Sequence, residues 1–230
     1  HNIISPSKSS KNDIQKYFHV DASKIHVIPN GIDTGIFKPN LMISKKPFKL
    51  ITTASADVPL KGLDFTLRAI AIAKDKYPLI NLVVIGKPRS GGHTERLISK
   101  LGIDEFVSFK TNLTNQEVSD EYASSQIAIV SSLYEGFGFP VGEAMACAVP
   151  LIATDVASIP EITGPYAEMI TPESYKDIFN SLDNIFQNYD HYMKKANLGR
   201  DHILQNFSWS VIANSYIDHI SSILTSHADI

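Results

Sequence analysis

The residues with the clearest chemical potential lie in one stretch, 131–154, which reads SSLYEGFGFPVGEAMACAVPLIAT. Two carboxylates, Glu135 and Glu143, enclose Gly136 and Gly138, with seven residues between the two glutamates. Glycine lets the backbone turn sharply and approach a ligand closely. The free N–H groups at the start of a following helix, together with its dipole, favour a bound phosphate. The stretch therefore predicts a site that binds an anion and hydroxyl groups.

Two predicted elements position these carboxylates. The apolar run Ile127–Val130 predicts a buried strand that ends just before Glu135, and open parallel sheets bind ligands at that end. A short apolar helix is predicted at about 141–148, with Pro140 at its first position. Glu143 is expected in its first turn among apolar residues, where a carboxylate needs partners such as sugar hydroxyls. Alternatively, Glu143 only complements the helix dipole, and Glu135 is a solvated loop residue.

These motifs resemble a known family. EGFGFPVGE, followed by AMACAVPLIAT and by Pro160–Glu161, is similar to the signature of the retaining family-four glycosyltransferases. The segments VIPNGID at 27–33, PLKGLDFTLRAI at 59–70 and FSW at 207–209 resemble the same family in the same order. The resemblance covers nearly the whole chain. It implies the GT-B architecture, in which two Rossmann-like domains face each other across a cleft.

The composition excludes several other classes of protein. Of the 230 residues, 43% are hydrophobic and 20% are charged, which suits an ordinary globular core. A net charge of −3 argues against a nucleic-acid partner, and no apolar run is long enough for a transmembrane helix. Cys147 is the single cysteine, so neither an internal disulfide nor a zinc site is expected. We expect a cytoplasmic protein, with peripheral contact at the inner face of the membrane as an option.

The pattern from residue 49 onward predicts an α/β fold. Short β-branched runs alternate with helical patterns, which indicates βαβ units and a Rossmann-like, doubly wound parallel sheet. Strands are expected at 50–54, 82–85, 107–109, 127–130, 151–153 and 167–170. Helices are expected between them at 63–77, 94–101 and 114–123, and C-terminal helices run from a Thr171-Pro172 cap to about 187, over 190–205, and from about 208 onward.

Three parts are expected along the chain. Residues 1–40 are interpreted as a remnant of the N-terminal GT-B domain with its linker, including short strands at 3–4 and 26–28 around a helix at 7–18. Residues 41–206 form the nucleotide-sugar-binding domain, and residues 207–230 form a C-terminal crossing helix. Because the chain starts without a methionine or an element start signal, we interpret it as a fragment of a longer protein. We expect the fragment to be inactive alone, because acceptor residues and half of the cleft would lie in the N-terminal domain.

The strand order places the candidate catalytic residues together. In the doubly wound order 3-2-1-4-5-6, the loops after strands 1 and 4 face each other. The first loop carries Ser55 and Lys61, and the second carries Glu135. A lysine just ahead of a helix suits a diphosphate as a point charge, although such a lysine is often simply solvated. The resemblance implies that Lys61 contacts the donor diphosphate, Glu135 holds hydroxyls of the donor sugar and Glu143 binds the ribose.

The resemblance also implies further binding positions. Backbone N–H groups of Gly136, Phe137, Gly138 and Phe139 would meet the sugar and the phosphates. The turn at Thr111 would lie near the nucleotide base. Since no DxD motif stands near the site, we expect neither a metal nor another cofactor.

The sequence departs from the family pattern near the phosphates. Many members carry an arginine five residues before the lysine, where this chain has Ala56. Either Ser55 and Asp57 reshape this loop, or another residue supplies the charge. Arg89 and His93 are candidates, unless they are ordinary loop residues. Thr111 and the pair Ala157-Ser158 also stand where glycines are common, and they leave the fold prediction unchanged.

These observations predict a retaining glycosyltransferase, a hexosyltransferase that moves a sugar from a UDP- or GDP-linked donor. The glycan or lipid-linked acceptor would be bound through the N-terminal domain. Fixed donors and a cation would stabilise the charge of the departing diphosphate. Two alternatives stay open. One is a nucleotide-sugar-binding module without turnover, and the other is a sugar epimerase of GT-B shape, which would need acid and base residues that are not evident in this half.

Overall fold

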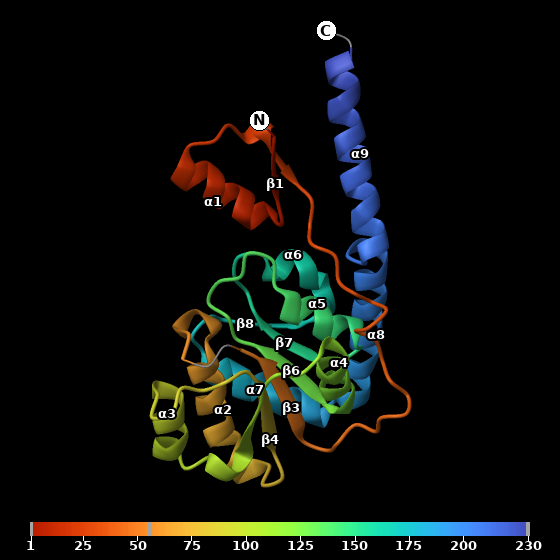
Figure 1. Ribbon diagram of the computed structural model, residues 1–230. Helices are drawn as coiled ribbons and strands as arrows, with labels where there is room; N and C mark the ends of the chain where they lie inside the picture. Colours follow the sequence, from red (N-terminus) through yellow and green to blue (C-terminus); the bar gives the residue numbers. More distant parts are fainter. Residues whose placement is uncertain (1, 55–56, 229–230) are drawn as a thin grey trace.

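The computed structural model describes residues 2–54 and 57–228, and its centre is a parallel sheet (Figure 1). The sheet has six strands in the order β5-β4-β3-β6-β7-β8. Every neighbouring pair in it is parallel. Counted along the chain, this is the order 3-2-1-4-5-6, so the predicted doubly wound α/β fold is confirmed. The strands are β3 (Lys49–Thr53), β4 (Asn81–Ile85), β5 (Val107–Lys110), β6 (Ile127–Val130), β7 (Leu151–Thr154) and β8 (Glu168–Ile170).

Helices cover both faces of the sheet (Figure 1). One layer contains α2 (Leu63–Lys76), α3 (His93–Leu101) and α7 (Tyr175–Gln187). The other contains α4 (Asn115–Ser124), α5 (Phe139–Ala146), α6 (Ile159–Thr163) and much of α8 (Tyr189–Asn206). Single turns of 3-10 helix lie at η1 (Ala22–Lys24), η2 (Pro59–Lys61), η3 (Asp104–Phe106) and η4 (Gly164–Tyr166).

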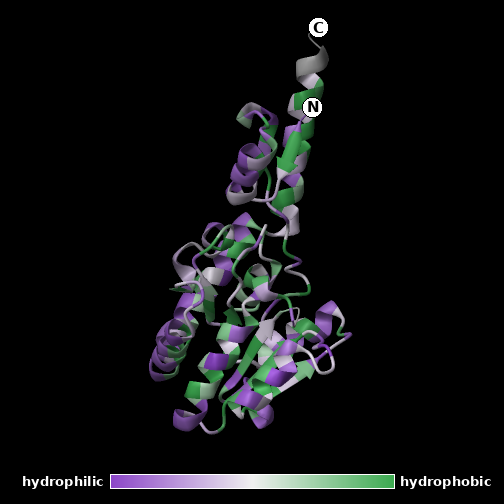
Figure 2. Ribbon diagram, turned by 90° about the vertical axis from the view of Figure 1, so that its left-hand side faces the viewer, coloured by the Kyte–Doolittle hydropathy of each residue, from purple (hydrophilic) through white to green (hydrophobic). Residues whose placement is uncertain are grey.

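The strands divide their side chains between two hydrophobic cores. Leu50 and Ile129 pack toward the layer of α2 and α7, whereas Ile51 and Val130 pack toward the layer of α5 and α8. Successive residues of a strand point to opposite faces, and a parallel sheet covered by helices is apolar on both. The strands accordingly carry mainly hydrophobic colours, whereas the helices around them mix hydrophilic and hydrophobic residues (Figure 2).

A small N-terminal unit stands above the carboxyl edge of the sheet (Figure 1). It consists of β1 (Ile3–Ser5), α1 (Lys8–Phe18) and β2 (Ile25–Val27), and β1 and β2 pair in parallel. The last helix, α9 (Trp209–Ala228), extends from the sheet domain along this unit. The rings of His26 and His219, whose centroids lie 4.1 Å apart, join β2 to α9. Among residues 2–54 and 57–228, the structure contains no helix that combines the length and the apolar character needed to cross a membrane.

The helix of the central motif, α5, begins earlier than the sequence predicted. Gly138 adopts φ +104° and serves as the N-cap, so Phe139 is the first helical residue and Pro140 the second. The helix ends at Ala146, and Ala148 turns the chain with φ +52°. Glu143 is therefore the fifth residue of α5, and the prediction that it lies in the first turn was wrong.

The predicted start of α7 at Thr171-Pro172 was also wrong. Glu173 has φ +62°, a left-handed conformation that a helix cannot contain. Ser174 is the N-cap instead, since its side chain accepts a hydrogen bond from the Asp177 N–H. Helix α6 was not predicted, because five residues are too few to show a helical period.

Candidate functional site

The loop that carries Lys61 is docked against the end of strand β6. The Leu133 N–H donates to the Leu60 carbonyl at 2.8 Å, and the Ser131 hydroxyl donates to the Gly62 carbonyl at 2.9 Å. Gly62 has φ +63°, and a Cβ at this position would lie only 1.9 Å from the Ser131 carbonyl oxygen. Only glycine fits this contact without strain, and the contact fixes Lys61 at the carboxyl edge of the sheet.

The structure brings Lys61 and Glu135 into direct contact. The Lys61 Nζ lies 2.8 Å from the Glu135 Oε1, and the Ser132 hydroxyl donates to the same oxygen at 2.8 Å. Glu135 is only 9% exposed, so it is not the solvated loop residue of the alternative interpretation. A buried carboxylate held by a lysine and a hydroxyl keeps lone pairs for a further donor, such as a ligand hydroxyl.

The glycine-rich loop presents its N–H groups rather than its carbonyls. The Ser158 hydroxyl donates to the carbonyls of Glu135 and Phe137 at 2.8 and 2.7 Å. Within residues 2–54 and 57–228, the backbone N–H groups of positions 136–139 have no hydrogen-bond acceptor. Because the carbonyls are occupied and the N–H groups are not, the loop offers a cluster of donors to an anion. Ser158 has this role only through the fold, and no signal in the sequence identified it.

The two phenylalanines of this loop differ in their surroundings. The side chain of Phe137 is buried and lies against Phe207. The side chain of Phe139 is 45% exposed and packs edge-on against Phe137.

Glu143 lies in apolar surroundings beside Tyr122. Burial raises the pKa of Glu143 to about 7, although a hydrogen bond from Tyr122 acts in the opposite direction. Burial and then the nearby Glu143 charge also raise the pKa of Tyr122. The Tyr122 hydroxyl in turn lies 2.9 Å from the Thr53 Oγ1, at the end of β3. Since Glu143 lies beyond the first turn of α5, complementing the helix dipole does not account for it.

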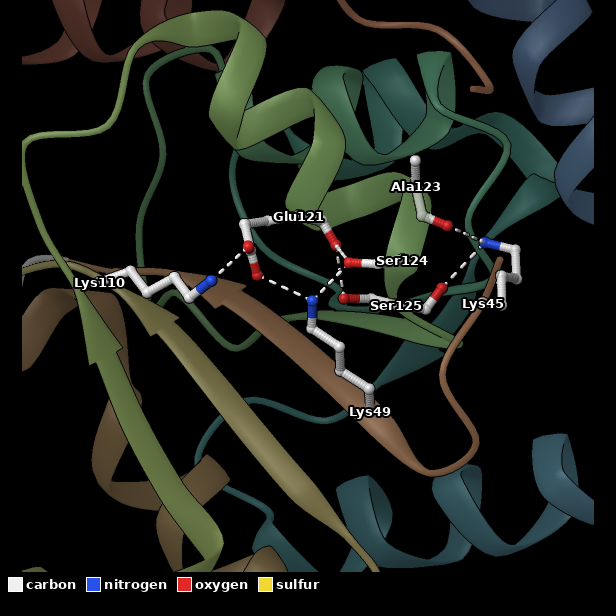
Figure 3. Close-up of polar contacts among 7 residues, drawn as sticks. All are labelled: Lys45, Lys49, Lys110, Glu121, Ala123, Ser124 and Ser125. Carbon is white, nitrogen blue, oxygen red and sulfur yellow. Dashed lines mark hydrogen bonds and ion pairs between the residues drawn. The ribbon is translucent and has the colours of Figure 1, made fainter. Parts of the chain in front are cut away.

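The turn at Thr111 follows β5 and is held by an ion-pair cluster (Figure 3). Glu121 of α4 binds Lys110 through one carboxylate oxygen and Lys49 of β3 through the other. Burial opposes ionisation of Glu121, but the two lysines outweigh it and lower its pKa. The Gly86 N–H donates to the Lys110 carbonyl at 3.0 Å, so the exposed Thr111 is held beside the end of β4.

Two hollows open near these loops, and their charges differ. One, of about 400 Å³, is lined by the ends of β3 and β4, by Pro140 of α5, and by the cations Lys61 and Lys87. The other, of about 290 Å³, contains three carboxylates, those of Asp57, Asp64 and Glu173. Coulomb attraction favours an anion in the first hollow and opposes one in the second.

The structure describes only part of the region that differs from the family pattern. Ser55 and Ala56, the predicted contact and the substituted arginine position, lie outside the described residues. Asp57 does reshape the neighbourhood, because its carboxylate accepts from the N–H groups of Arg89 and Thr94, both at 2.8 Å. Burial opposes ionisation of Asp57, but these two bonds, a hydrogen bond with the Thr94 side chain and attraction to the Arg89 side chain outweigh it and lower the pKa of Asp57. Asp57 thereby ties the loop after β3 to the loop after β4.

The two candidates for the substitute charge do not line the cationic hollow. His93 lies 2.6 Å from the Asp64 carboxylate and lines the acidic hollow. Arg89 is exposed in the loop between β4 and α3, and it is absent from the lining of both hollows. Lys87, which sequence reasoning missed, lines the cationic hollow together with Lys61. Across the described part of the chain, no cluster of His, Cys, Asp or Glu is arranged to hold a metal ion.

Known proteins share this sequence pattern. The profile of the family described as "Glycosyl transferases group 1" matches residues 37–202, and that of "Glycosyltransferase Family 4" matches residues 1–35. An MMP alpha-(1->4)-mannosyltransferase from Mycolicibacterium hassiacum is 33% identical over 92% of this chain. A D-inositol 3-phosphate glycosyltransferase from Streptomyces bingchenggensis is 23% identical over 94% of it. The chain spans about half the length of these relatives, 51% of each.

Solved structures share the fold. Anabaena HepE, in complex with UDP and glucose, has a TM-score of 0.84 and 19% identity over 96% of this chain and 63% of its own. Sucrose-phosphate synthase from Thermosynechococcus elongatus has a TM-score of 0.84 and 20% identity, over 97% and 58% of the two chains. The C-terminal domain of LpcC, a glycosyl transferase group 1 family protein from Francisella tularensis, has a TM-score of 0.68 and 26% identity over 78% of this chain and 100% of its own. The fold and the match over residues 37–202 together establish that this chain belongs to the glycosyl transferases group 1 family.

Proposed function

We propose that this chain forms the donor-binding part of a retaining glycosyltransferase that uses a nucleotide-diphosphate sugar. The observation that carries the proposal is the pairing of Lys61 with Glu135 beside the unpaired N–H groups of residues 136–139. A cation and fixed N–H donors suit a diphosphate, and a carboxylate acceptor suits sugar hydroxyls. Both chemistries meet in one place, as a sugar joined to a diphosphate requires.

In the proposed reaction, the bond between the anomeric carbon of the sugar and the diphosphate breaks, and a bond from that carbon to an acceptor hydroxyl oxygen forms with the same anomeric configuration. Negative charge develops on the departing diphosphate, which takes up the proton that the acceptor hydroxyl releases. Lys61 and the N–H groups of the loop stabilise this charge in fixed positions. Glu135 accepts hydrogen bonds from the donor sugar and also keeps Lys61 oriented. Glu143 accepts from the ribose hydroxyls, and the turn at Thr111 lies near the base.

The relatives support the choice of substrate class. HepE is a structure with UDP and glucose, and the two curated relatives are named as transferases of sugars. We therefore propose a nucleotide-linked donor, either UDP- or GDP-linked. We further propose a glycan or lipid-linked acceptor and a cytoplasmic site of action. Because the leaving charge would be met by Lys61 and backbone donors, we propose that transfer does not depend on a metal.

Substitution of the two contacting side chains tests the proposal. In the full-length protein, Lys61→Ala and Glu135→Ala should each lower the rate of sugar transfer by at least about a hundredfold, since one such contact typically contributes that much. Lys100→Ala, which changes an exposed lysine of α3, is the control and should leave the rate unchanged. Transfer is followed as labelled sugar on the acceptor. Near-normal turnover in either variant would overturn the assignment, and an isomerised nucleotide sugar without transfer would point to an epimerase.

A further inference from the structure

We propose that Lys87 is a second cationic ligand for the diphosphate of the donor. This inference rests on the proposed function, because it assumes that a diphosphate occupies the 400 Å³ hollow. Lys87 follows strand β4, and it is therefore supplied by the loop next to the one that carries Lys61. The position five residues before Lys61 is Ala56, so that position provides no charge.

The charge balance of the hollow is the first argument. Lys61 and Lys87 both line it, but the Lys61 ammonium is already bound to the Glu135 carboxylate at 2.8 Å. The pair formed by Lys61 and Glu135 is neutral as a unit. Lys87 has neither a carboxylate nor a hydrogen-bond acceptor within the part of the chain that the structure describes. Lys87 therefore supplies the net positive charge that a dianionic or trianionic ligand would meet.

The backbone around Lys87 is anchored on both sides. Before it, the Gly86 N–H donates to the Lys110 carbonyl at 3.0 Å. After it, the Asp57 carboxylate accepts from the N–H groups of Arg89 and Thr94. Because the backbone here is already fixed, less conformational entropy is lost when the lysine side chain binds a ligand. The stem of Lys87 therefore starts at a fixed point on the rim of the hollow.

Arg89 gives a matched comparison on the same loop. It is a cation two residues away and exposed like Lys87, yet it does not line the hollow. If any positive charge on this loop attracted the ligand through the general field, Arg89 and Lys87 would contribute alike. If direct contact matters, only Lys87 will contribute strongly, because screening at physiological salt weakens the more distant charge.

The test is calorimetric titration of the protein and its Lys87→Ala, Lys87→Arg and Arg89→Ala variants. The ligands are UDP, GDP and ADP, together with UMP, GMP and AMP. For the diphosphate that binds, Lys87→Ala should raise Kd about tenfold or more, as loss of a charge-assisted hydrogen bond does. Lys87→Arg and Arg89→Ala should stay within about threefold of the parent protein. The loss caused by Lys87→Ala should be smaller for the matching monophosphate.

The outcomes separate this inference from the proposed function. If a diphosphate binds the parent protein and Lys87→Ala binds as Arg89→Ala does, the inference is overturned and the proposed function stands. If the parent protein binds none of the diphosphates, the proposed function and the inference both fail. Unchanged thermal unfolding of Lys87→Ala, expected for an exposed side chain, verifies that any loss of binding is local.

Discussion

At the scale of single residues, Glu143 shows how the fold changes the chemistry of a side chain. Its carboxylate is partly enclosed beside Tyr122, and burial raises its pKa from 4.5 to about 7. The folded protein therefore holds this proton at pH values where the unfolded chain has released it. Ionising such a carboxylate costs free energy, and hydrogen bonds from the hydroxyls of a bound ribose could offset that cost.

This raised pKa predicts a dependence of stability on pH. Between pH 4.5 and about 7 the folded state binds more protons at Glu143 than the unfolded state does, so the stability contributed by this residue falls as the pH rises and stays low above 7. In Glu143→Gln that fall should disappear. Urea unfolding at pH 5, 6, 7 and 8 measures the free energy of unfolding of both proteins. Between pH 5 and pH 8, the stability of Glu143→Gln relative to the parent protein should rise by at most about 3 kcal/mol. Glu105→Gln, at an exposed site, is the control, and parallel stability curves for all three proteins would contradict the raised pKa.

At the scale of elements, the contact between the loop of η2 and the end of β6 determines where Lys61 stands. The close approach of Gly62 to the Ser131 carbonyl leaves no space for a side chain. The two hydrogen bonds beside it join residues far apart in the sequence. The site therefore depends on a backbone contact as much as on its charged side chains.

The substitution Gly62→Ala should be strongly destabilising. It adds a Cβ that would lie 1.9 Å from a carbonyl oxygen and forces alanine to φ +63°. We expect a loss of about 2–4 kcal/mol from the combined clash and backbone strain, seen as a clear fall in Tm. Gly91→Ala is a matched control, because Gly91 has φ +64° and an added Cβ there would meet nothing within 4 Å. Equal losses in the two variants would show that the contact with Ser131 is unimportant.

The elements also show what the sequence could predict. The positions of the strands followed from buried apolar runs, because a strand that is apolar on both faces can be recognised locally. Their order followed from the common doubly wound topology. That order also predicted that the loops of Lys61 and Glu135 face each other, whereas the ion pair between the two side chains was not predicted. The start of α7 could not be predicted, because Glu173 adopts a left-handed conformation and glutamate is not a residue type that signals one. Ser158 and Lys87 were missed for a similar reason, since contacts between separate loops arise only from tertiary structure.

At the scale of the whole molecule, the N-terminal unit rests on the candidate site. The hydroxyls of Ser7 and Ser10 donate to the Gly136 carbonyl at 2.8 and 3.0 Å. The Glu161 carboxylate of α6 accepts from the N–H groups of Lys8 and Ser9, both at 2.8 Å, at the start of α1. A carboxylate at a helix N-terminus is a favourable arrangement. These contacts connect the glycine-rich loop to the unit above it.

Loss of the Glu161 charge should loosen this connection. In Glu161→Gln, one backbone N–H of α1 would face an amide group instead of a carboxylate oxygen, and a charge-assisted bond would be lost. We expect amide hydrogen exchange in residues 8–18 to accelerate about tenfold, while exchange in β3 and β6 stays unchanged. Glu105→Gln again serves as the control. Unchanged exchange in α1 would show that the carboxylate does not hold the unit in place.

The most direct test of the central claim is calorimetric titration of the protein with UDP, GDP and ADP, each in magnesium and in EDTA. We predict that one diphosphate binds saturably at one site with the same Kd in both buffers. We also predict that Glu143→Ala abolishes this binding. If none of the three diphosphates binds, or if binding requires magnesium, the account of a metal-independent donor site built on Lys61, Glu135 and residues 136–139 is contradicted.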